Sequence, residues 1–183
     1  MTAPIDTLTL TGSINLPIKT LGGMLASLSA FWDFLDIVWE AGGEAAAETA
    51  AKDKIFVEME ERDSAGLAGN RPFAMIHLGD AYRQTRIGAG SSDEFRQTGS
   101  LDVLFEADVA EAEEGASNAA KAMTVFTSRL GAVVDAMLGI SGGSGRLSFT
   151  SVSWPEGAPV RASYEEREAG NDYIVGAVRF EYY

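Results

Sequence analysis

Residues 119–139 read AAKAMTVFTSRLGAVVDAMLG, and the spacing of the apolar residues in this stretch decides the fold. Successive apolar positions lie four or three residues apart, as on one face of an amphipathic helix. They are Ala119, Met123, Phe126, Leu130, Val133 and Met137. Acidic residues at 111–114 precede them, where the helix dipole favours negative charge, and Gly139 follows. A helix over 115–139 must bury its apolar face, which predicts packing against a second layer.

Segments with the alternation typical of β-strands lie on both sides of this helix. They are residues 73–78, 101–107, 147–154, 160–165 and 173–183. Leu101, Val103 and Phe105 share one parity, and Asp102 and Glu106 share the other. Short connections between paired strands imply antiparallel neighbours. The sequence therefore predicts an α+β fold, an antiparallel β-sheet of about four to five strands with helices packed on one face.

A second apolar stripe predicts a helix nearer the N-terminus, ending before the glycine pair at 42–43. Its members are Met24, Leu28, Phe31, Leu35 and Val38. Residues 45–51 (AAAETAA) favour a second short helix or an exposed extension, and residues 55–59 suit either a strand or a continuation of that helix.

The domain organisation follows from these elements. Residues 1–20 are expected to form an N-terminal arm or a short strand around Leu8 and Leu10. Residues 21–183 are expected to form a single α+β domain with a polar arm at 81–99, which is either a long loop or the tip of an extended hairpin.

Composition excludes several classes of function. The 183 residues include 27 Asp and Glu against 14 Lys and Arg, a net charge of −13, which argues against binding nucleic acid or anionic membranes generally. The absence of cysteine and the single histidine exclude disulfides, thiolate metal sites and a two-histidine metal site within one chain. The most apolar stretch, 21–38, carries Asp33 and Asp36, which argues against a membrane span. No cofactor, metal or membrane partner is expected.

His77 is the one candidate general base. It lies in the apolar run 73–78, where a structural role is the favoured interpretation and a catalytic role the alternative. Carboxylates at 58–61 and 111–114 are close in sequence, but acidic runs at helix starts have an ordinary capping explanation. The glycine-rich stretches lack the endings of phosphate-binding loops. We therefore expect no enzyme activity.

The polar arm instead presents a candidate interface. Aromatic and arginine side chains, which are enriched at protein interfaces, gather there in an otherwise acidic chain. The hypothesised interface residues are Tyr82, Arg83, Arg86 and Arg96. The alternative is a solvated loop that happens to contain arginines.

The order of the elements resembles the tail terminator (tail completion) proteins of long-tailed bacteriophages and related gene-transfer particles. The matching pieces are the helix at 24–38, the strand FAMIHLGD at 73–80, the arm at 81–99, the strand at 101–108, the helix at 115–139 and the strands of 146–183. The resemblance covers residues 20–183 and rests on order and length, because that family has no diagnostic catalytic motif. Residues 1–20 and 42–71 fit it less well.

The resemblance implies a homo-oligomeric ring, commonly a hexamer, that caps the head-proximal end of the tail tube. The implied partners are further copies of this chain, the tail tube protein and the head connector or neck protein, with DNA only passing through the lumen. The implied location is the virion tail, assembled in the host cytoplasm. Alternatives are another head–tail neck component, a tail tube subunit, or, in a different class, a small α+β hydrolase using His77 or a host interaction module.

Overall fold

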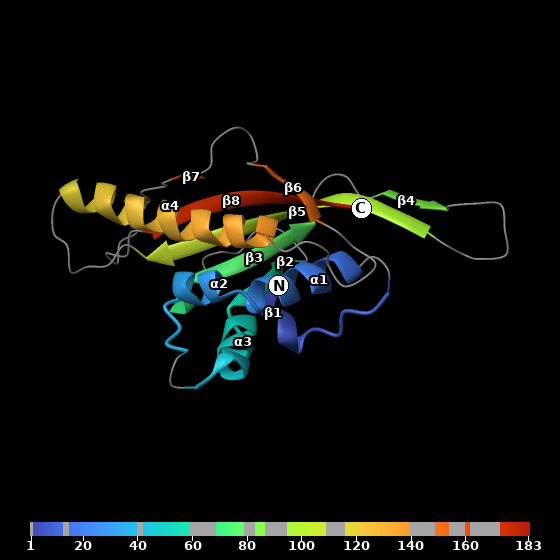
Figure 1. Cartoon of the computed structure of the whole chain (residues 1–183), viewed down its shortest axis with the longest axis horizontal. Coiled ribbons are helices and arrows are strands. Elements are labelled where there is room, and N and C mark those ends of the chain that lie inside the picture. Colours follow the sequence, from blue (N-terminus) through green and yellow to red (C-terminus); the bar gives the residue numbers. More distant parts are fainter. Residues whose placement is uncertain are drawn as a thin grey trace.

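The structure, a computed structural model, combines helices with a β-sheet (Figure 1). It describes residues 2–12, 15–39, 42–58, 69–78, 83–86, 95–108, 116–139, 149–153, 160–161 and 173–183. The helices are η1 (Ile5–Thr7, a 3-10 turn), α1 (Leu16–Ala26), α2 (Ser29–Phe34), α3 (Glu44–Lys52) and α4 (Ala116–Gly139). The strands are β1 (Thr2–Pro4), β2 (Ile55–Glu58), β3 (Phe73–Leu78), β4 (Arg83–Arg86), β5 (Phe95–Asp108), β6 (Phe149–Ser153), β7 (Val160–Arg161) and β8 (Tyr173–Tyr182).

The sheet confirms the predicted α+β class and differs in detail. Its strand order is β1-β2-β3-β5-β8-β6, with β4 also paired to β5 and β7 to β8. It has eight strands rather than four to five, because the short strands β1, β4 and β7 add to it. The expected antiparallel sheet is mixed, since β2 runs parallel to β3. The sequence of residues 55–58 suited a strand and a helix equally well, so it could not predict that this segment pairs parallel with β3.

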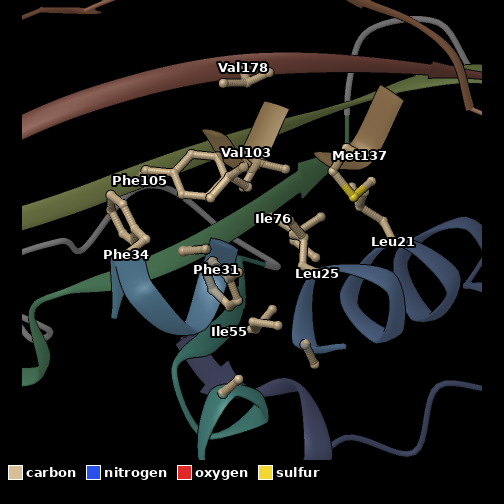
Figure 2. Packing of buried hydrophobic residues seen from close by; sticks show 14 of the residues in the cluster. Leu21, Leu25, Phe31, Phe34, Ile55, Ile76, Val103, Phe105, Met137 and Val178 are labelled. Carbon is tan, nitrogen blue, oxygen red and sulfur yellow. The ribbon is translucent and has the colours of Figure 1, made fainter. Parts of the chain in front are cut away.

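One face of the sheet carries the larger of two clusters of buried hydrophobic residues. Side chains of β3 and β5, including Ile76, Val103 and Phe105, point toward Phe31 and Phe34 of α2 (Figure 2). In Figure 2, Leu21 and Leu25 of α1 and Met137 of α4 belong to the same cluster. Helices α1 to α4 therefore cover one face, as expected.

Helix α4 lies as its spacing predicts. Phe126, Leu130 and Val133 are 4%, 1% and 0% exposed, and the half-buried Met123 packs against the same core. The helix approaches β8 closely at Gly176, where an added Cβ would lie 2.6 Å from Leu130 Cδ2. Glycine at this position thus lets the helix sit directly on the strand.

The expected single helix over 24–38 is wrong, because the chain breaks between α1 and α2. Leu28 is extended, with φ −88° and ψ 124°. The Ser27 hydroxyl donates to the Met24 carbonyl over 2.8 Å, and the buried Trp32 Nε1 donates to the Ala26 carbonyl over 2.6 Å. These bonds satisfy carbonyls at the end of α1 and hold the corner. Val38, the last member of the predicted stripe, is 79% exposed.

The N-terminal segment also differs from the expected arm. The strand is at Thr2–Pro4, paired antiparallel with β2, and not around Leu8 and Leu10. Helix α1 begins at Leu16, with a proline in its first turn, so the expected boundary at residue 20 lies inside a helix. A proline is compatible with the first turn, where its missing N–H needs no partner. The helix over 45–51 and the strand alternative for 55–58 are both confirmed.

A buried ion pair fastens one end of the sheet. Arg71 and Glu106 have side chains 3% and 0% exposed, and Arg71 Nε donates to Glu106 Oε2 over 3.1 Å. Arg71 Nη1 also donates to Asp108 Oδ1 over 3.3 Å. The guanidinium carbon lies 3.9 Å from the centre of the Tyr173 ring. Arg71, two residues before β3, thus joins this segment to β5 and β8, although its sequence context indicated only a loop.

Shortening Phe126 to alanine tests the helix-on-sheet packing. We expect Phe126→Ala to lower the free energy of unfolding by about 3–5 kcal/mol, because it opens a cavity in the core. Chemical denaturation measures the loss. Val125→Ala is the matched control, since Val125 is 52% exposed on the same helix turn, and it should cost far less. Equal losses would contradict the packing.

Removing Arg71 tests the buried ion pair. Arg71→Ala removes the cation beside a buried carboxylate, and we expect a loss of about 3–5 kcal/mol in the free energy of unfolding. Arg129→Ala serves as the comparison, because Arg129 pairs with Asp36 at 2.7 Å with side chains 41% and 65% exposed. That exposed pair should contribute less than about 1 kcal/mol. Similar effects of the two substitutions would refute the assigned role of Arg71.

Candidate interaction surface

The described part of the polar arm is a two-stranded ribbon. We define the ribbon as residues 83–86 of β4 and 95–98 of β5, which pair antiparallel. Figure 1 shows it extending beyond the end of the sheet, away from helices α1 to α3. Of the two predicted forms of the arm, these strands favour the extended hairpin. Residues 81–82 and 87–94 lie outside the described residues.

Strand β5 supplies the base of the ribbon. Its residues 99–108 pair with β8, and residues 101–106 also pair with β3. Residues 95–98 have β4 as their only strand partner in the described part of the chain. The ribbon is thus a continuation of a core strand, which fixes its direction, but it has only two strands, and such ribbons are marginally stable in water by themselves.

The ladder divides the predicted interface residues between two faces. Arg83 is opposite Thr98, and Arg96 is opposite Thr85. Because side chains alternate along a strand, positions 83, 85, 96 and 98 share one face. Arg86, opposite Phe95, belongs to the other face. The structure therefore brings Arg83 and Arg96 together and separates Arg86 from them. Tyr82 is outside the described residues.

Arg83 is exposed, whereas Gln97, on the other face, is half-buried with its Oε1 buried. Diagonal positions such as 83 and 96 are about 7–8 Å apart in an antiparallel pair. Thr98, on the same face as Arg83, is half-buried too, so exposure does not distinguish the two faces. Sequence reasoning grouped all the arginines, because the strand sequences do not reveal which residue of β4 pairs with which residue of β5.

Charge sets the ribbon apart from the rest of the chain. Its strands, RQTR and FRQT, contain three arginines and no acidic residue. Subtracting these three from the 14 basic residues leaves 11 against 27 acidic ones elsewhere, a net charge of −16. The strands of the ribbon are a basic element on a strongly acidic chain. That charge is suited to contacts with carboxylates.

His77 occupies a different part of the sheet. It is half-buried in β3, opposite Asp102 of β5. Asp102 in turn accepts two hydrogen bonds from Arg179 of β8, from Nε over 2.6 Å and from Nη2 over 2.7 Å. This bidentate pair was missed by sequence reasoning, although both residues were on the polar parity of their strands. Asp102, the residue opposite His77 in the ladder, is therefore already paired with Arg179.

Two further features bear on chemistry. No group of three or more His, Asp or Glu side chains among the described residues is placed to hold a metal ion. None of the helices in the described ranges has the length and apolarity needed to cross a membrane. That the chain is not an enzyme stays a prediction.

The comparisons with known proteins add no family. No family model matches the chain, and no curated protein matches it.

Hydrogen exchange tests the description of the ribbon. Amides of residues 101–106, between two strands, should exchange more slowly in the isolated subunit than those of 95–98, because opening the ribbon leaves the core intact. Residue-resolved exchange by NMR measures this. Equal protection along all of β5 would contradict a ribbon held by one ladder.

Proposed function

We propose that this chain is a virion structural protein, a tail terminator that forms a homo-oligomeric ring on the head-proximal end of a phage tail tube. The observation that carries the proposal is the basic ribbon, which extends beyond the sheet of an acidic subunit. The order of elements from β3 to β8 supports it, because it agrees with the order on which the resemblance rests, whereas the expected helix over 24–38 is divided between α1 and α2.

The ribbon favours contacts of the head-to-tail kind. A projecting element on one subunit needs a different, complementary surface on the next one, and repeated contacts of this kind close into rings or continue as filaments. In a ring that caps a tube, the ribbon of every subunit would point in the same direction relative to the neighbouring subunit. In this proposal the ribbon reaches a neighbouring copy or the end of the tail tube, and another face of the ring docks to the head connector.

The net charge is compatible with a DNA-conducting ring. Strong phosphate binding would hinder passage of the duplex, and a chain with a net charge of −13 does not favour it. DNA would then pass through the lumen without being held. The partners in this proposal are further copies of the chain, the tail tube protein and a neck protein.

The alternatives predict other properties. Another neck component or a tube subunit would share the virion location, but α4, 24 residues long, counts against a strand-rich tube subunit. A hydrolase would need His77 beside a catalytic group, and Asp102, the residue opposite His77 in the ladder, is paired with Arg179. A host interaction module would have no affinity for tail tubes.

The oligomeric state and tube binding test this proposal together. We expect a closed ring in solution or, where assembly needs the tube, rings at one end of purified tail tubes, because the ribbon requires a complementary surface. Sedimentation measures the mass, and negative-stain images of protein mixed with tubes locate it. Bovine serum albumin at the same concentration controls for passive sticking. A protein that stays monomeric and does not bind tail tubes would refute the proposal.

A further inference from the structure

We infer that one face of the ribbon, the face holding Arg83 and Arg96, is the contact with a second copy of this chain and recognises carboxylates on its acidic surface. The inference rests on the proposed function and sharpens it. It assigns the contact to two of the predicted arginines, names the partner chemistry and excludes Arg86 from that contact.

The register is the first step. Arg83 opposite Thr98 and Thr85 opposite Arg96 form two adjacent pairs of the ladder. All four positions lie on one face, and each residue type there donates hydrogen bonds. Two arginines about 7–8 Å apart on a pleated surface match a pair of neighbouring carboxylates. The opposite face, with Phe95 and Gln97, has no such pairing of arginines.

Accessibility is the second step. Arg83, the arginine of this face whose side chain the structure describes, is exposed. An incoming surface can therefore reach Arg83 without displacing part of its own subunit. The β5 strand of the ribbon continues into ten further ladder positions, 99–108, so the direction of that strand is set before a partner arrives. Less ordering entropy is lost on binding when an element is preorganised.

Charge complementarity is the third step, and it selects the occupant. Outside the ribbon strands the chain has 27 acidic and 11 basic residues, 11 being 14 minus the three ribbon arginines. A second copy thus carries a net charge of the opposite sign to the ribbon arginines. Nucleic acid would also attract arginine, but the whole subunit repels phosphate, and repulsion acts over about 8–10 Å at ordinary salt. A carboxylate-bearing copy of the same chain fits better.

The ladder also predicts that the contact does not extend the sheet. The contact uses side chains on the ribbon's face, so it does not require a new strand to pair along β4. Arginines at both ends of β4 further disfavour indiscriminate edge pairing, because charged side chains on an edge strand resist it. The contact should therefore be specific and salt-sensitive rather than a continuation of the sheet.

Charge reversal on the full chain tests the inference. Arg83→Glu with Arg96→Glu should weaken self-association by about 100-fold, since two buried-contact charges are replaced by repulsion. The matched control is Lys19→Glu with Lys121→Glu, which changes the charge equally at two exposed positions, one on α1 and one on α4. Arg86→Glu should stay within about threefold of wild type, because position 86 faces the other way. Sedimentation gives the dissociation constants, and thermal unfolding verifies each fold.

The outcomes separate this inference from the proposed function. Loss confined to the Arg83/Arg96 variant, with wild-type association weakening from about 0.05 M to about 0.5 M NaCl, supports it. Normal rings from that variant would overturn the inference and leave the ring proposal standing. A wild-type chain that neither associates nor caps tubes would overturn both.

Two further results would also be decisive. If the Arg83→Glu/Arg96→Glu variant does not fold, Arg83→Gln with Arg96→Gln removes the charges without repulsion and must still reduce association. If wild-type protein binds a short DNA duplex and the variant loses that binding while its rings persist, the face binds phosphate and the inference is wrong. An Arg86→Glu variant as defective as the pair would place the contact on the other face and overturn it too.

Discussion

The main-chain ladder along β5 is the interaction on which the other features of the structure depend. The strand is 14 residues long, pairs with β8 over residues 99–108 and with β3 over residues 101–106, and continues into the ribbon. Its odd positions, such as Val103 and Phe105, supply the core beneath the helices. Its even positions include Asp102 and Glu106, which hold the ion pairs of the opposite face. One strand thus contributes to the core beneath the helices, to the opposite face of the sheet and to the candidate interface.

The two arginine pairs lie on the face of the sheet opposite the helices, which also carries the buried apolar cluster of Phe56, Phe73 and Met75. Glu106 is fully buried with Arg71, whereas Asp102 and Arg179 keep side-chain exposures of 24% and 30%. Burying charge is costly unless it is paired with good geometry. Arg179 donates two hydrogen bonds to Asp102, over 2.6 and 2.7 Å, whereas Arg71 donates one to Glu106 over 3.1 Å and its buried Nη2 has no hydrogen-bond partner among the described residues. The pairs join β5 to β8 and to Arg71, which lies two residues before β3. They therefore add side-chain links between segments whose strands the main-chain ladders already pair.

The spacing of apolar residues predicted correctly those helices and strands that bury a single apolar face. Helix α4 and strand β5 follow their patterns because each has a single apolar side to bury. Prediction failed where a local hydrogen bond overrides periodicity. Ser27 ends α1 by bonding to Met24, although the apolar spacing runs on into α2. Short strands such as β1 depend on a distant partner, β2, and three residues carry too little pattern to reveal one.

The candidate site was predictable in composition and not in geometry. Arginines stood out in an acidic chain, but their faces depend on which residue of β4 meets which residue of β5, and a shift of one residue would exchange the faces. Pairing with β8 over residues 99–108 and with β3 over residues 101–106 sets the direction of β5, but the pairing of β4 with residues 95–98 is a separate ladder. Correct pairing of β4 with β5 is therefore a condition for bringing positions 83 and 96 to one face, in addition to the folding of the core.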